Sequence, residues 1–241
     1  MRFQLISCEV LFREMCDAVA HSPHQVNVQF LSKGLHDLGG KAMRRQLQEH
    51  IDKAEDCDAV LMGYALCGNG LHGLEARTVP LVLPRAHDCI ALLMGSRKRY
   101  GEFFEANPGT YFRSTGWIER GKTLHQLAMG QSAAGDSLDA LIERYGEENG
   151  RYLFEEFTRY RQNYRQLTYI ETGLEPDSRF EDQARQEAGE RGWAFSKVTG
   201  SLALFRKLVN GDWPEEDFLV VPPGGRAVAS YDGRVICCEE S

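Results

Sequence analysis

Cys8, Cys67 and Cys89 each come shortly after an apolar run that is typical of a buried β-strand. In an open α/β sheet, ligands bind outside the carboxyl ends of the strands, so residues far apart in the sequence can meet there. Thiolates are preferred ligands of zinc and of iron–sulfur clusters. The sequence therefore predicts a thiolate-lined site, in competition with the more common role of a free cysteine as a small buried hydrophobe.

An imidazole and two carboxylates stand beside these thiols. His87 precedes Asp88 and Cys89, and Glu9 follows Cys8. The predicted metal ligands are Cys8, Cys67, Cys89 and His87, with zinc as the expected metal and an iron–sulfur cluster as the alternative. The predicted catalytic residues are His87, Asp88 and Glu9, because they can orient the ligands or move protons. Glu9 also suits the first turn of a helix, where the dipole favours a carboxylate.

A glycine-rich segment directly follows Cys67. Residues 68–73 fit the pattern G-x-G-x-x-G, which lets backbone N–H groups approach an anion or ligand at the start of a helix. Dinucleotide binding is disfavoured, since no acidic residue stands at the expected strand end. We expect Gly68, Asn69 and Gly70 to contact a cofactor or ligand.

The order of the predicted elements indicates an α/β fold. Short β-like runs alternate with helical patterns over residues 1–110, which predicts a mostly parallel sheet. A charged helical insertion is expected at 111–165, and strands and helices alternate again over 166–241, ending in a hairpin around residues 232–233. We thus predict two Rossmann-like lobes with a helical insertion between them, and a ligand cleft between the lobes.

Composition narrows the function classes. The chain has 241 residues and a formal net charge of −7, and its basic residues are scattered, which disfavours nucleic acid as a partner. The apolar runs are too short to cross a bilayer, and seven cysteines in a chain of this size favour reduced thiols. We expect a cytoplasmic protein without a membrane partner, with the insertion as a possible contact between two identical subunits.

Four segments carry a resemblance to a known family. They are residues 7–11 (SCEVL), 63–74 (GYALCGNGLHGL), 83–89 (LPRAHDC) and 218–225 (FLVVPPGG). The chain resembles a bacterial and archaeal family known as domain of unknown function 1638. The resemblance implies a role in one-carbon or methyl-group metabolism beside corrinoid-dependent methyltransferases, with a small methylated substrate or a corrinoid protein as partner. It brings no established catalytic residues.

Three functions remain open from the sequence. The first is a metal-thiolate protein in methyl transfer, in which zinc makes an acceptor thiol or amine nucleophilic at neutral pH. The second is a binding module without catalytic activity that holds a corrinoid protein, a methylated ligand or an iron–sulfur cluster. The third is a cysteine-based racemase-like enzyme, against which stands the lack of a strand-end cysteine in the predicted second lobe.

Overall fold

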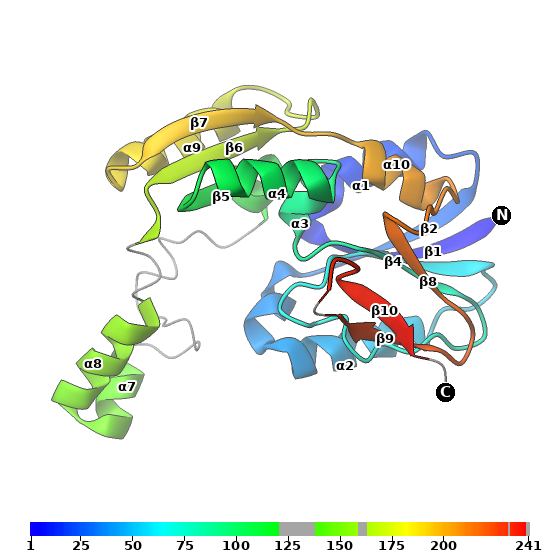
Figure 1. Ribbon diagram of the computed structural model, residues 1–241, viewed down its shortest axis with the longest axis horizontal. Helices are drawn as coiled ribbons and strands as arrows, with labels where there is room; N and C mark the ends of the chain where they lie inside the picture. Colours follow the sequence, from blue (N-terminus) through cyan, green and yellow to red (C-terminus); the bar gives the residue numbers. More distant parts are fainter. Residues whose placement is uncertain (121–137, 159–162, 231, 240–241) are drawn as a thin grey trace. The chain divides into compact units, whose positions relative to one another are not determined.

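The computed structural model describes residues 1–120, 138–158, 163–230 and 232–239, which form a mixed α/β structure with three sheets (Figure 1). The strands are β1 (Arg2–Cys8), β2 (Gln25–Leu31), β3 (Ala59–Gly63), β4 (Leu81–Pro84), β5 (Thr110–Ser114), β6 (Gln166–Glu171), β7 (Ala194–Thr199), β8 (Phe218–Val221), β9 (Arg226–Ala229) and β10 (Ile236–Glu239). The helices are η1 (Glu9–Leu11), α1 (Phe12–Ala20), η2 (Lys33–Leu38), α2 (Gly40–Ile51), α3 (Cys89–Leu93), α4 (Arg97–Ala106), α5 (Thr115–Glu119), α7 (Leu138–Tyr145), α8 (Glu147–Thr158), α9 (Arg179–Glu190) and α10 (Ala203–Val209).

The largest sheet has the strand order β2-β1-β3-β4-β8. The first four strands are parallel, and β8 pairs antiparallel with β4 at the edge. The connection from β1 through α1 leads to one neighbour of β1, and the connection from β2 through α2 leads back across β1 to its other neighbour. Right-handed crossovers in opposite directions place α1 and α2 on opposite faces of the sheet (Figure 1). The strand order therefore reverses between β1 and β3, a topological switch point of the kind at which ligands bind.

The apolar pattern of the sequence accounts for this sheet. Every residue of β3 and β4 is buried, as expected for parallel strands that are covered on both faces. On α2 the buried residues are Met43, Leu47 and Ile51, whose four-residue spacing places them on one face of a helix. Helix α1 packs against α10, so residues from near both ends of the chain cover one face of the sheet.

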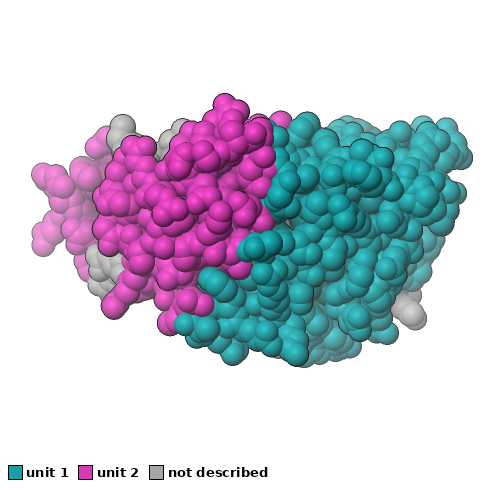
Figure 2. Space-filling model, turned by 90° about the horizontal axis from the view of Figure 1, so that it is seen from above, with its two compact units in different colours: residues 1–106, 172–174, 199–241 teal, residues 107–171, 175–198 magenta. Residues whose placement is uncertain are grey.

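The chain divides into two compact units, but not at the predicted boundaries (Figure 2). Unit 1 contains residues 1–106, 172–174 and 199–241, and unit 2 contains residues 107–171 and 175–198. The predicted division at 1–110, 111–165 and 166–241 differs because it assigns residues 199–241 to a second lobe. In the structure β8 completes the sheet of unit 1, and α10 packs on α1. Two Rossmann-like lobes are not confirmed.

Unit 2 is built on the three-stranded sheet β5-β6-β7, in which β5 and β6 are parallel. Residues 111–114 of β5 lie inside the region 111–165 that was predicted to be helical, together with α5, α7 and α8. Residues 121–137 and 159–162 of that predicted insertion lie outside the described residues. Helix α9 covers the sheet of unit 2 with Phe180, Ala184 and Ala188, which pack against Leu167 and Tyr169 of β6.

The predicted C-terminal hairpin is confirmed. Strands β9 and β10 pair antiparallel, with Ala229 opposite Ile236. Across the described residues we find no helix whose length and apolar character would let it span a membrane.

Candidate functional site

The residues of unit 1 that were predicted to bind a metal or to act in catalysis lie near the carboxyl ends of its parallel strands. Cys8 is the last residue of β1, and Cys67 follows β3. His87 follows β4, and His36 lies in η2, directly after β2. One edge of one sheet thus carries side chains from four strands, as expected for a ligand site of an open α/β fold.

Cys8 and His36 are in direct contact at this edge. The Sγ atom of Cys8 lies 3.6 Å from Nε2 of His36, and Cys8 is only 3 % exposed. Cys8 is held by the pairing of β1 with both β2 and β3, and η2 begins with a cap in which the Ser32 hydroxyl accepts from the Gly34 amide. The end of β1 and the short helix η2 therefore position a thiol and an imidazole within reach of one another.

Cys67 lies next to these residues in a strained turn. Cys67, Gly68 and Asn69 have φ angles of 46°, 65° and 67°, so three successive residues adopt the left-handed conformation. A non-glycine residue such as Cys67 rarely adopts it, and such strain concentrates at functional sites. The Cys67 amide donates to the carbonyl of His87 at 2.9 Å, which ties this turn to the end of β4.

The Tyr64 side chain is buried near both thiols. Tyr64 directly follows β3 and is 1 % exposed, and its hydroxyl has no hydrogen-bond partner among the described residues. Burial raises the pKa of Tyr64 far above its usual value, and negative charges on Cys8, Cys67 and Glu9 would raise it further. A buried hydroxyl without a partner is costly, so it marks a place where a ligand, ion or water would be stabilised.

Glu9 joins the ends of β1 and β2. Its Oε1 atom accepts from the backbone amide of Lys33 at 2.8 Å. Glu9 thereby fixes the start of η2, the element that carries His36. The catalytic role of Glu9 stays a prediction. Through its contact with η2, the Glu9 side chain also helps to fix the position of His36.

His87 and Asp88 lie at a neighbouring cavity of about 460 Å³, which Tyr100 and Phe104 also line. The Asp88 side chain caps α3 by accepting from the amides of Ile90 and Ala91, and its other oxygen accepts from the Tyr100 hydroxyl at 3.0 Å. The negative charge of Asp88 raises the pKa of Cys67, so the two groups are near one another. Cys89 begins α3 and is partly buried.

The glycine-rich segment differs from its predicted geometry. No helix begins after Gly70, because residues 67–73 form successive turns. The segment packs on the start of α2 instead: a Cβ atom on Gly40 would lie 2.9 Å from the carbonyl oxygen of Gly68. Contact of Gly68, Asn69 and Gly70 with a cofactor stays a prediction.

The four predicted metal ligands do not form a ready metal-binding group. Within the described ranges, no three His, Cys, Asp or Glu side chains are close enough together to hold a metal ion. The structure brings together Cys8 and His36, with Cys67 near enough that a charge on Cys8 shifts its pKa. His36 was not among the site residues predicted from the sequence. The available signal was its place five residues after the end of β2, at the same edge as Cys8.

The thiols of Cys8 and Cys67, which with His36 form the thiol cluster, are both held in the neutral form. Burial raises the pKa of Cys8 to about 11 and that of Cys67 to about 12, from an ordinary value of 9.0. At pH 8 only about one Cys8 in a thousand is then ionised. Because the neutral forms are favoured by folding, this contribution to stability is complete below pH 9 and is lost as the pH rises toward 11 and 12.

We therefore expect Cys8 and Cys67 to resist alkylation at pH 8, because the thiolate is the reactive form. Cys16 is exposed and should be alkylated first. The measurement is mass spectrometry of peptides after brief iodoacetamide treatment of the folded protein, with urea-unfolded protein as the control. Rapid labelling of Cys8 in the folded state would contradict the burial that the structure gives it.

Comparison with known proteins gives one match. A family model described as a protein of unknown function (DUF1638) matches residues 30–209. No curated protein and no solved structure matches the chain.

Proposed function

The chain belongs to the DUF1638 family, whose description assigns no activity, and from the chain's own residues we propose a thiolate metal site at the β1/β3 switch point. Cys8, His36 and Cys67 would hold the metal, and zinc is the expected ion. The ligand set differs from the one expected from sequence, because His36 takes the place of His87 and Cys89 is left out. The observation that carries the proposal is the contact between Cys8 and His36.

The separation of these two atoms suits a shared metal ion. Zinc binds sulfur at about 2.3 Å and imidazole nitrogen at about 2.1 Å in tetrahedral geometry, which sets the two ligand atoms about 3.6 Å apart. The observed separation between Cys8 Sγ and His36 Nε2 is 3.6 Å. A thiol–imidazole hydrogen bond has a similar length. The distance alone therefore does not distinguish a shared metal ion from a hydrogen bond, and the surroundings of the pair must do so.

One feature of the surroundings supports a metal. The Tyr64 hydroxyl is buried beside the thiols without a partner among the described residues, and a bound ion with its remaining ligand would give it one. The raised pKa values of the two thiols oppose metal binding, because a metal binds the thiolate, so the charge of the bound cation would have to favour the ionised form. Cys8 and His36 are already in contact, and Cys67 is close enough to Cys8 for a charge on Cys8 to raise its pKa.

We propose methyl transfer as the chemistry of this site, because the family resemblance implies a setting among corrinoid-dependent methyltransferases. Zinc held by thiolates would lower the pKa of an acceptor thiol or amine that binds to it. Glu9 would orient His36 through η2, since its carboxylate holds the Lys33 amide. The cavity beside His87, with Tyr100 and Phe104 in its wall, is a place for the apolar part of a small methylated substrate.

Metal analysis of untagged protein purified without air tests the site. We expect about one equivalent of zinc in the wild type and less than about a tenth of an equivalent in Cys8→Ser, His36→Ala and Cys67→Ser. After cobalt substitution, the wild type should show thiolate-to-cobalt absorption, and Cys8→Ser should lose most of it. Circular dichroism of each variant checks that the loss does not come from unfolding.

Cys89→Ser is the matched control, because it removes a thiol from the same edge of the sheet and should keep the zinc. Loss of zinc in this variant would favour the ligand set expected from sequence and contradict ours. A brown protein would point to an iron–sulfur cluster and the binding-module function. If the folded wild-type protein contained no metal, the proposed metal site would be wrong.

One observation favours a second function. Cys8 and His36 are also close enough for a thiol–imidazole pair that transfers protons without a metal, with Cys67 as a second thiol. In contrast to a two-lobed racemase, both thiols would come from one sheet. Metal-free protein that exchanges deuterium into the α-carbon of an amino acid, with activity lost in Cys8→Ser, would support this function.

A further inference from the structure

A second cavity of unit 1, away from the thiols, is lined mostly by charged residues. It has a volume of about 660 Å³, which is the size of sites for small organic ligands. Its wall is formed by one face of α2, the segment 72–77 and the hairpin of β9 and β10. The cationic side chains in this wall are Lys41, Arg44, Arg45, Arg77 and Arg226.

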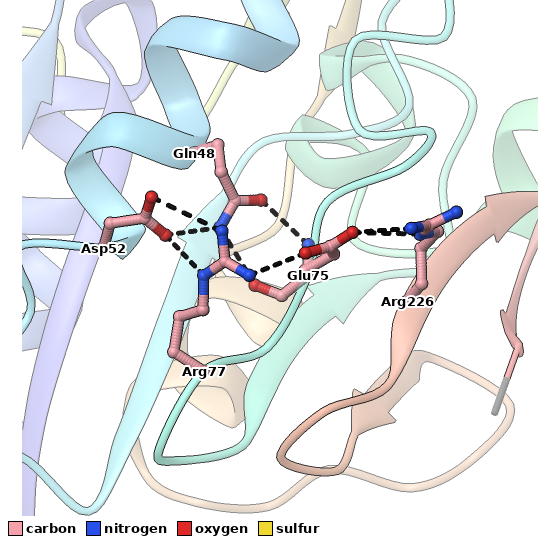
Figure 3. Close-up of polar contacts among 5 residues, drawn as sticks. All are labelled: Gln48, Asp52, Glu75, Arg77 and Arg226. Atoms are coloured by element: carbon pink, nitrogen blue, oxygen red, sulfur yellow. Dashed lines mark hydrogen bonds and ion pairs between the residues drawn. The ribbon is translucent and has the colours of Figure 1, made fainter. Parts of the chain in front are cut away.

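Two of these cations are already neutralised. Arg77 donates to Asp52 at 2.7 Å and to Glu75 at 2.6 Å, and Arg226 donates to Glu75 at 2.7 Å (Figure 3). The Gln48 amide group fixes the same segment, since it both donates to the Glu75 carbonyl and accepts from the Glu75 amide. This network forms a rigid and nearly neutral part of the cavity wall.

The other three cations have no direct ion-pair partner among the described residues. Lys41, Arg44 and Arg45 make no hydrogen bond or ion pair with any described residue, although they line the same cavity. They lie at positions i, i+3 and i+4 of α2, so they share one helix face. They also belong to the first half of this 12-residue helix, where the helix dipole adds positive potential.

His72 adds a neutral donor to this wall. The Ala229 amide donates to Nδ1 of His72 at 3.1 Å, so Nδ1 is the acceptor and the ring proton is on Nε2. Nε2–H is thus left as a donor in a side chain that lines the cavity. The carboxylates of Glu49 and Glu239 line the cavity as well, and they suit hydroxyl groups of a ligand rather than its anionic group.

We infer that this cavity binds a small phosphate-bearing molecule, with its phosphate held by Lys41, Arg44 and Arg45. Guanidinium groups match phosphate oxygens with paired donors, and charge-assisted hydrogen bonds are about twice as strong as neutral ones. The volume leaves room for one or two phosphate groups and a polar organic body. The site is separate from the thiol cluster, so it stands whether or not that cluster binds a metal.

Isothermal titration with ADP, inorganic pyrophosphate and adenosine tests this site. We expect ADP or pyrophosphate to bind, and adenosine, which has no phosphate, not to bind. Arg44→Gln should weaken phosphate binding about tenfold or more, which is the value of one charge-assisted contact. Arg45→Gln should weaken it in the same direction, and because Arg45 is exposed this variant does not disturb the fold.

Lys53→Gln is the matched control, since it removes one charge from an exposed lysine just beyond α2 that does not line the cavity. Tighter binding of ADP assigns the site to an organic phosphate, and tighter binding of pyrophosphate assigns it to an inorganic one; both uphold the phosphate site. Absence of binding by both probes, or equal affinities in Arg44→Gln, Arg45→Gln and Lys53→Gln, would overturn it.

Discussion

Replacing Glu187 with alanine should destabilise unit 2 by about 3–5 kcal/mol, the range for removal of one partner from a buried ion pair. Arg113 of β5 is completely buried, and its Nε and Nη2 atoms donate to the two carboxylate oxygens of Glu187 on α9, both at 2.9 Å. Without Glu187, the guanidinium would remain inside unit 2 with no carboxylate to compensate its charge. The loss would separate β5 from the helix that covers it.

Urea unfolding followed by hydrogen exchange of peptides from β5 and α9 measures this effect within unit 2. Glu190→Ala is the control, because it removes an exposed carboxylate from the same helix and should change stability by less than about 0.5 kcal/mol. The double variant Arg113→Met/Glu187→Leu should recover most of the lost stability, since an apolar pair of similar size needs no charge compensation. Equal stabilities of Glu187→Ala and Glu190→Ala would show that the ion pair does not hold unit 2.

Replacing Gly63 with alanine should destabilise unit 1 by about 1–3 kcal/mol, the usual cost of overpacking a tight core. Gly63 ends β3 and lies opposite Ser7 of β1. A Cβ atom on Gly63 would lie 2.3 Å from the Ser7 Oγ atom and 2.5 Å from its Cβ atom, so β1 must move. Cys8 is the next residue of β1, and the change should therefore also weaken any metal bound there.

A second substitution that makes room for the new methyl group at position 63 serves as the control. Ser7→Gly removes the two atoms that the new methyl group would meet, so Ser7→Gly/Gly63→Ala should be more stable than Gly63→Ala alone. Met15 is also close, but only the end of its flexible side chain is involved. The comparison needs urea unfolding and zinc content of both variants. If the second substitution brings no recovery, the contact between β1 and β3 is not the cause of the destabilisation.

The local elements, and the edge of the sheet at which the candidate residues lie, could be predicted from the sequence. The four-residue spacing of Met43, Leu47 and Ile51 is typical of one helix face, and these are the buried residues of α2. The apolar run at residues 218–221 is typical of a strand and forms β8. The placement of Cys8, Cys67 and His87 at strand ends also followed from apolar runs and the rule for parallel sheets. The apolar periodicity of a segment depends only on the residues of that segment. The type of element and its buried face can therefore be predicted without knowing the fold.

The partners of these elements could not be predicted in the same way. Strand β8 pairs with β4 across more than a hundred residues, and nothing in its four residues distinguishes this partner from a strand nearer in sequence. The same ambiguity placed residues 199–241 in a second lobe. His36 was missed because its position after β2 becomes informative only once β2 is known to pair with β1, which ends in Cys8. Cavity walls such as that around Arg44 depend on packing of the whole unit.

The path of the chain through unit 1 has a consequence for its biosynthesis. Strand β4 ends at Pro84 and its edge partner β8 begins at Phe218, so about 130 residues leave the ribosome between the two. At roughly 5–20 residues per second this takes on the order of ten seconds, during which all of unit 2 is synthesised. The apolar edge of β4 stays unpaired over that time, and a nascent chain with such an edge is a natural client for chaperones.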